Sequence, residues 1–172
     1  MRIIGLDPGT RVTGWGIVEA EGTRLRRVSS GTLAPKGEDL ASRLVGIADG
    51  LDAIISEYAP QAGAVESLFH AKNSPSALKL GHARGVILLS LARANVGVFE
   101  YPPSRIKQAV TNHGRARKEQ VQEMVKLLLG YGESMVLDES DALAAAICHA
   151  QYRGSSSSQL MEDLYRKALG RS

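Results

Sequence analysis

RIIGLDPGT, residues 2–10, contains the strand around which the rest of the chain is expected to assemble. The apolar run Ile3 to Leu6 is too short for a helix and stops at a Pro-Gly break, which predicts a buried strand that ends at Asp7. Pro8 has no N–H with which to continue a sheet, and Gly9 allows another group to come close. Asp7 is therefore expected at the carboxyl end of a central strand, where open α/β sheets usually bind ligands. The alternative is ordinary turn chemistry, in which Asp7 only caps the Pro-Gly turn.

The composition is typical of a globular protein of one domain. Of 172 residues, 44% are hydrophobic and 23% charged, and the net charge of +3 is too small to indicate a nucleic-acid partner by itself. The single cysteine, Cys148, excludes an internal disulfide and a thiolate metal site, and its alanine-rich surroundings predict a buried thiol. Because neither a signal peptide nor a membrane-spanning stretch is visible, a cytoplasmic protein with no membrane partner is expected.

Hydrophobic periodicity predicts three strands, a helix, a strand, a helix, a strand and then further helices. The first three strands are expected to form an antiparallel meander, since only Glu21 to Thr23 separate the second from the third. After the first strand, we predict strands at 13–19, 25–33, 62–66 and 96–101, and helices at 38–58, 74–94, 104–111, 117–129 and 138–152. This order predicts a mixed five-stranded sheet of the α/β class, with strand 2 antiparallel and helices on both faces. Residues 1–153 are expected to form the domain, and 154–172 a flexible serine-rich linker and tail.

Four acidic residues occupy positions where distant parts of the chain would meet. Glu66 ends its strand as Asp7 does, and neighbouring parallel strands end at the same edge of a sheet. Asp138 and Asp141, three residues apart, would face one side of the first turn of the last helix. These two also suit structural roles, Asp138 as an N-cap and Asp141 near the positive end of the helix dipole.

Convergence of the four carboxylates would have a chemical consequence. They repel one another and would persist at one site only with cations between them. Oxygen ligands favour hard ions such as Mg²⁺ or Mn²⁺, and two such ions about 4 Å apart form a clamp suited to phosphodiester cleavage. The predicted catalytic and metal-binding residues are therefore Asp7, Glu66, Asp138 and Asp141.

The chain resembles the RuvC-type Holliday junction resolvases over roughly residues 2–150, in unbroken order. The similarity lies in GLDPGTRVTGWG at 5–16, ESLF at 66–69, ALKLGHARG at 77–85 and DESDALA at 138–144. It implies a ribonuclease H-like fold, a homodimer, and catalysis by the four acids with two Mg²⁺ ions per active site, for which Mn²⁺ can substitute.

The resemblance further implies the reaction and its context. The expected activity is a pair of symmetric nicks in four-way junction DNA, leaving 5′-phosphate ends, in homologous recombination and DNA repair. The branch-migration proteins RuvA and RuvB are the implied partners. Two departures from the family pattern are Asn112, where glycine is frequent, and the serine-rich tail.

A basic segment between Tyr101 and Lys118 is expected to contact DNA phosphates. It contains no acid, one histidine and five basic residues, which are Arg105, Lys107, Arg115, Arg117 and Lys118. A solvated helix face is the alternative, although mixed charges would fit that better. By resemblance, Lys107 and Lys118 lie near the scissile phosphate. By their charge, Arg115 and Lys72 are further predicted DNA contacts.

Phe69 follows Glu66 in a polar loop. As an ordinary phenylalanine it would anchor the loop in the core. By resemblance it is a wedge that stacks on an unpaired base at the junction centre, a contact worth roughly 1–3 kcal/mol.

Three other functions fit the sequence less well than junction resolution does. A YqgF-like RNA-processing nuclease of the same superfamily shares the opening strand and Asp-Pro-Gly turn, but should lack the 71–85 block and Phe69. An actin-like or sugar-kinase ATPase needs two similar halves, for which 172 residues leave no room. A junction-binding module without catalysis would not need four acids. For the homodimer, the apolar helix at 76–94 is the candidate interface, because two matched nicks need two sites related by a twofold axis.

Overall fold

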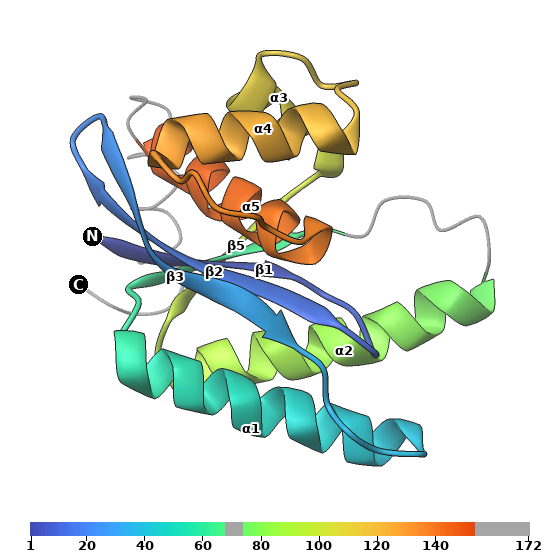
Figure 1. The fold of residues 1–172 in the computed structure, drawn as a ribbon. Coiled ribbons are helices and arrows are strands. Elements are labelled where there is room, and N and C mark those ends of the chain that lie inside the picture. Colours follow the sequence, from blue (N-terminus) through green and yellow to red (C-terminus); the bar gives the residue numbers. More distant parts are fainter. Residues whose placement is uncertain (68–73, 154–172) are drawn as a thin grey trace.

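β1, residues Arg2–Asp7, is the central strand of a five-stranded sheet with the order β3-β2-β1-β4-β5 (Figure 1). The computed structural model describes residues 1–67 and 74–153. The other strands are β2 (Thr13–Glu21), β3 (Arg24–Leu33), β4 (Ala62–Glu66) and β5 (Gly97–Tyr101). The helices are α1 (Leu40–Tyr58), α2 (Ser74–Arg93), α3 (Pro103–Thr111), α4 (Lys118–Leu129) and α5 (Leu137–Arg153).

The strand pairing confirms the predicted mixed sheet. β1 pairs antiparallel with β2 and parallel with β4, while β2 pairs antiparallel with β3, and β4 parallel with β5. The register places Leu6 beside Val65, so Asp7 and Glu66 end neighbouring parallel strands at one edge of the sheet. The opening strand therefore ends where α/β sheets usually bind ligands.

The helix boundaries differ from the predictions by one or two residues, and two of the differences matter. α3 begins at Pro103, one residue earlier than predicted, and the position suits proline because the missing N–H would have no partner there. α5 begins at Leu137, so Asp138 lies inside its first turn and not at the N-cap position proposed as a structural alternative.

Helices cover both faces of the sheet, as predicted: α1 and α2 lie on one face, and α3, α4 and α5 on the other (Figure 1). The alternation of β1 separates the two cores. Ile4 and Leu6 are fully buried against α1 and α2, whereas Ile3 is fully buried on the side of α5. Cys148 lies in the core on the side of α5 and is 2% exposed, which confirms the predicted buried cysteine. Burial raises the pKa of its thiol to about 12.

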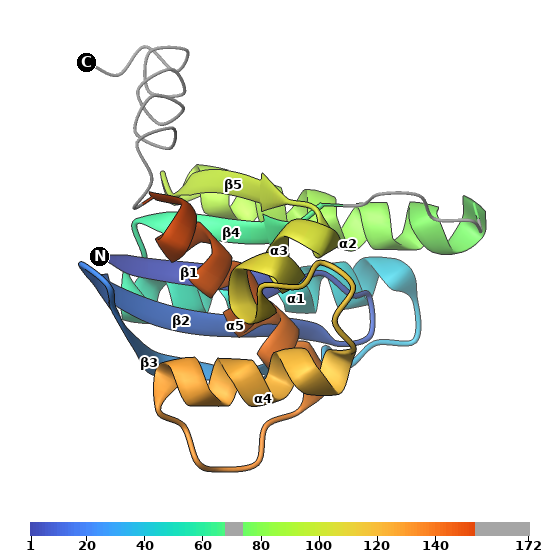
Figure 2. The same ribbon diagram turned by 90° about the horizontal axis from the view of Figure 1, so that it is seen from above.

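α5 packs with its backbone directly against β1 and β2, and Figure 2 shows it crossing over these strands. A Cβ atom on Gly5 would lie 1.9 Å from the carbonyl oxygen of Ala142, and one on Gly14 would lie 1.9 Å from that of Asp138. The helix contributes alanines to this contact, including the fully buried Ala142 and Ala146. Small residues on both elements thus permit this close packing.

Within the two described ranges, no helix combines the length and the apolar character needed to cross a membrane.

Replacing Gly5 by alanine should destabilise the fold strongly. The new methyl group would meet a backbone oxygen at 1.9 Å, which a flexible side chain cannot relieve, so we expect a loss of about 3 kcal/mol or more in unfolding free energy. Urea denaturation measures this. In the control Gly132→Ala, no atom lies within 4 Å of the new Cβ, and the change should stay within about 0.5 kcal/mol. Equal stability of the two variants would contradict the close packing of α5.

Candidate active site

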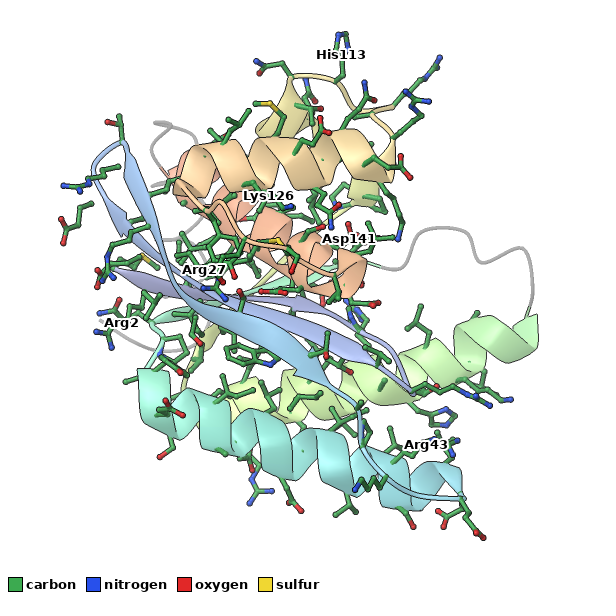
Figure 3. All side chains as sticks on the ribbon, viewed as in Figure 1. Arg2, Arg27, Arg43, His113, Lys126 and Asp141 are labelled. Carbon is green, nitrogen blue, oxygen red and sulfur yellow. The ribbon has the colours of Figure 1, made fainter. Side chains whose placement is uncertain are left out.

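The edge of the sheet where β1 and β4 end brings the four predicted acids together. Asp7 pairs across the sheet with Gly14 of β2, and the backbone of Asp138 lies against Gly14. The contact between α5 and β2 therefore places Asp138 beside Asp7. Asp141 follows one turn along α5 (Figure 3), and Glu66 ends the neighbouring strand.

The carboxylate of Asp7 is influenced by the charges of the other three predicted acids. Its pKa rises from an ordinary value of 3.8 to about 7, chiefly because burial removes water from the carboxylate. The negative charges of Asp141, Glu66 and Asp138, in that order of effect, raise the pKa further, and Lys118 partly opposes them. The other three predicted acids thus lie within electrostatic reach of Asp7.

Two lysines supply positive charge to this cluster. The Lys118 ammonium donates a hydrogen bond to Oδ2 of Asp141 at 2.9 Å, and this bond raises the pKa of the lysine. Burial, followed by the charge of Asp141, raises the pKa of Glu66, whereas Lys118 and Lys107 lower it. Both lysines predicted to lie near the scissile phosphate are therefore beside the carboxylates.

The donor set fits a hard divalent cation by its chemistry. Carboxylate oxygens are the ligands that Mg²⁺ and Mn²⁺ prefer, and four carboxylates face only two ammonium groups. The carboxylates do not form a closed coordination site as they stand. Within residues 1–67 and 74–153, no three His, Cys, Asp or Glu side chains are close enough together to hold a metal ion.

The basic segment forms the surface next to the acids. Lys107 donates to the carbonyl oxygen of Ala116 at 2.8 Å, which ties α3 to the loop before α4. The Thr111 hydroxyl lies within hydrogen-bond distance of two carbonyl oxygens, that of Lys107 at 2.8 Å and that of His113 at 3.0 Å, and can donate to either. It also accepts a hydrogen bond from the His113 N–H at 3.2 Å. Asn112 ends α3 with a φ of 59°, the left-handed conformation that asparagine tolerates.

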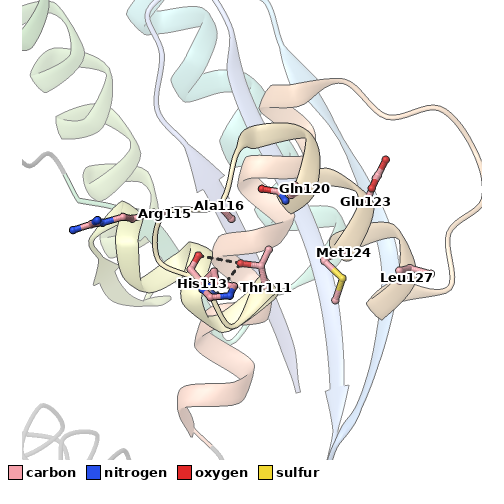
Figure 4. A pocket seen from close by; sticks show the side chains of 8 residues that line it. All are labelled: Thr111, His113, Arg115, Ala116, Gln120, Glu123, Met124 and Leu127. Carbon is pink, nitrogen blue, oxygen red and sulfur yellow. Dashed lines mark hydrogen bonds between the residues drawn. The ribbon is translucent and has the colours of Figure 1, made fainter.

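A hollow of about 440 Å³ opens in this surface (Figure 4). Arg115 and His113 line it on the loop, and Met124 and Leu127 of α4 supply apolar side chains. Arg115 is exposed, as a phosphate-binding residue should be. Two other predicted DNA contacts, Phe69 and Lys72, lie outside the described residues.

One charged residue beside the site, Glu139, is not among the residues predicted from the sequence. Glu139, between Asp138 and Asp141, is only 9% exposed and contacts Arg27 and Ser30 of β3. Its position could have indicated this contact. Glu139 lies between two candidate ligands on a helix expected to pack on the sheet, and an acid that is buried in such a place needs a partner.

Comparison with known proteins gives the family. The sequence profile described as "Crossover junction endodeoxyribonuclease RuvC" matches residues 3–149. The chain belongs to the RuvC family. A RuvC protein of Syntrophotalea carbinolica is 53% identical over 151 residues, which cover 87% of this chain and 94% of that protein. A RuvC protein of Paramagnetospirillum magneticum is 50% identical over 156 residues, covering 90% and 94%.

Solved RuvC structures agree with the fold. Thermus thermophilus RuvC in complex with a Holliday junction substrate has a TM-score of 0.84 and 32% identity, and covers 90% of this chain and 95% of its own. The yeast mitochondrial Holliday junction resolvase has a TM-score of 0.62 at 11% identity, covers 95% and 84%, and supports the fold alone. The predicted ribonuclease H-like architecture and the RuvC resemblance are therefore confirmed.

The raised pKa of Asp7 predicts how stability depends on pH when metal is removed by a chelator. Between about pH 4 and pH 7 the folded protein keeps a proton on Asp7 that the unfolded chain has released, so stability falls as the pH rises through this window. Asp7→Asn removes this effect and should therefore be more stable than the wild type at about pH 8, with a smaller difference at about pH 5.

Urea denaturation in EDTA at the two pH values measures the effect. Asp52→Asn, an exposed change on α1, is the control and should follow the wild type. Identical pH dependence of Asp7→Asn and the wild type would contradict the electrostatic cluster.

Proposed function

We propose that this RuvC-family endodeoxyribonuclease resolves Holliday junctions with Asp7, Glu66, Asp138 and Asp141 as its catalytic, metal-binding residues. The observation that carries the proposal is the convergence of these carboxylates on Asp7, beside Lys118 and Lys107. Four carboxylates in electrostatic contact are a costly arrangement for folding, and divalent cations relieve that cost.

The proposed cofactor is Mg²⁺, two ions per active site, with Mn²⁺ as a substitute. When bound, the ions would activate water and stabilise the leaving oxygen of the cleaved phosphodiester. The chain's own residues orient the reaction. The carboxylates of β1, β4 and α5 face one edge of the sheet, and the adjacent lysines offer positive charge to the phosphate. Each nick would leave a 5′-phosphate end.

DNA binding is assigned to the surface that continues from the acids. The basic segment carries Lys107, Arg115 and Lys118, and Thr111 and Lys107 brace its loop. Such a surface attracts phosphates without reading sequence, which suits an enzyme that selects a four-way shape. Lys72 is proposed as a further phosphate contact because of its charge, and Phe69 as the base-stacking wedge from the family resemblance.

The homodimer is proposed to form through α2 and its groove with α1. A hollow of about 790 Å³ lies there, lined by residues such as Leu44, Leu78 and Val86. Leu78 and Leu89 are 66% and 57% exposed, and they lie on one face of α2 about three turns apart, so this face presents apolar side chains to solvent. A second copy is the occupant that matches a junction's twofold symmetry, because two nicks require two related active sites.

The wider context follows from the substrate. Junctions arise in recombination and DNA repair, so we propose a cytoplasmic enzyme that works with the branch-migration proteins RuvA and RuvB. The RNA-processing alternative is disfavoured by the RuvC profile, which spans residues 3–149. We also propose that residues 1–153 suffice as the nuclease domain and that 154–172 act as a linker and tail.

Asp7→Asn should abolish cleavage and retain junction binding. The substitution removes a metal-binding oxygen and one negative charge at the centre of the cluster. The rate should fall by more than the roughly 10–100-fold that loss of an outer-shell partner costs. Synthetic four-way and linear DNA, incubated with and without Mg²⁺, measure cleavage, and a gel-shift assay in EDTA measures binding. Asp52→Asn should cleave as the wild type does. Near wild-type nicking by Asp7→Asn would contradict the assignment.

Leu89→Glu should convert the dimer into a monomer. A carboxylate in the apolar face of α2 would be buried without a partner on association. Sedimentation at about micromolar concentration, where a standard interface holds a dimer, measures the mass. The control is Leu127→Glu on α4, on the opposite face of the sheet, where the leucine is 73% exposed. This substitution should leave the dimer intact. A dimeric Leu89→Glu protein would exclude this interface.

A further inference from the structure

A buried charged cluster lies beneath the first turn of α5. Glu139 is 9% exposed and accepts a hydrogen bond from the Ser30 hydroxyl, and one of its oxygens lies 3.4 Å from Nη2 of Arg27. Nε of Arg27 in turn donates to the Ser30 hydroxyl oxygen at 2.5 Å. Glu139 stands between Asp138 and Asp141, so this cluster holds the same turn that carries half of the proposed catalytic carboxylates.

A β-bulge in β3 makes the cluster possible. Arg27 pairs with Val18 of β2, and Ser29 pairs with the adjacent residue Ile17. Val28 is therefore an extra residue of β3 that has no partner of its own in the register with β2. In a regular strand, residues 27 and 30 would point to opposite faces, because their separation is odd. The bulge reverses the alternation and directs both Arg27 and Ser30 to the face that α5 covers.

The packing of β3 agrees with this reversal. Leu25, before the bulge, packs in the core on the side of α5. Val28 and Leu33 both pack in the core on the side of α1 and α2, although they too are separated by an odd number of residues. Bulges are frequent next to active sites, where they redirect a side chain.

Arg27 also fixes the loop that leads into α5. Its guanidinium lies over the ring of Tyr131, 4.2 Å from the centroid, and the Tyr131 hydroxyl donates to Glu133 at 2.9 Å. Figure 3 shows Arg27 on the sheet side of α5 and Asp141 on the helix itself. One arginine thus contacts both the loop before α5 and the first turn of that helix.

We propose that Glu139, held by Arg27 and Ser30, is a positioning residue that sets the rotation of the first turn of α5 and so aims Asp138 and Asp141 at Asp7. The inference rests on the proposed function, which assigns catalysis to those carboxylates. A first turn lacks intrahelical partners for its N–H groups and frays readily. Here the charges of Asp138 and Asp141 also repel Asp7. Glu139 lies between these two aspartates in the sequence, and its buried contact with Arg27 and Ser30 resists both fraying and repulsion.

The test is a Mn²⁺ titration, followed by the electron paramagnetic resonance signal of the free ion, together with thermal unfolding and junction binding in EDTA. In Glu139→Gln and Arg27→Met, Mn²⁺ binding should weaken about 10–100-fold, as for other partners that orient ligands. The Mg²⁺ concentration for half-maximal cleavage should rise in parallel, while junction binding stays unchanged. Arg27→Lys, which keeps the charge, should recover part of the affinity.

Arg26→Met is the matched control. Arg26 precedes Arg27 on β3 and pairs with Glu19 of β2, at a distance of 2.5 Å, so this change also removes an ion pair from the strand but leaves α5 untouched. Its Mn²⁺ affinity should equal that of the wild type. A role in stability alone would lower the unfolding temperature of Glu139→Gln without changing its Mn²⁺ affinity, and that result would overturn the proposal.

Two further variants separate the possible failures. If Asp7→Asn binds Mn²⁺ as the wild type does, the proposed metal site is wrong. If Asp7→Asn loses affinity while Glu139→Gln retains it, only the positioning role is wrong. Should Glu139→Gln unfold at the assay temperature, Ser30→Ala removes one hydroxyl and keeps both charges. A smaller loss of Mn²⁺ affinity in that variant supports the proposal, and unchanged affinity overturns it.

Discussion

The close contact between α5 and the sheet is the constraint on which the site depends. Gly5 and Gly14 leave no side chain between the strands and the helix, and the carbonyl oxygens of Ala142 and Asp138 occupy the space where Cβ atoms would stand. The absence of these two methyl groups determines how near the start of α5 lies to the end of β1. Residues distant in the sequence therefore meet because their backbones touch, and the acidic side chains only extend that contact.

This contact has an electrostatic cost. Burial and three neighbouring carboxylates raise the pKa of Asp7 to about 7, and the lysine at position 118 compensates only part of the charge. Natural proteins accept such destabilisation at sites where a ligand or the reaction requires it. The surrounding structure must then be stiff enough to prevent the carboxylates from moving apart. The anchored first turn of α5, with Glu139 buried against β3, provides stiffness where the repulsion acts.

Much of this arrangement could be predicted from local patterns. The apolar run before Asp7 and the similar run before Glu66 are short enough to indicate strands, and parallel strand ends meet at one edge. The alanine-rich surroundings of Cys148 correctly indicated that this thiol is buried. Each of these inferences uses neighbours in the sequence, where the periodicity of side chains carries the information.

The unpredicted features depend on contacts between distant residues. The bulge at Val28 lies in a strand of mixed polar and apolar residues, where a reversed alternation leaves no clear pattern. The contact of Arg27 with Glu139 spans 112 residues, and the bond of Lys118 to Asp141 spans 23. Such pairs are chosen by the packed fold from many possible partners. The roles of Phe69, Lys72 and the 154–172 segment stay predictions.

The buried position of Cys148 has a practical consequence. It is the only cysteine of the chain, and its thiol stays protonated far above neutral pH because its pKa is about 12. A thiol reacts with maleimides and iodoacetamides as the thiolate, so the Cys148 thiol should not react with these reagents in the folded protein. A cysteine introduced on the surface would then be the single point of attachment for a fluorophore or spin label, with no need to remove the native residue first.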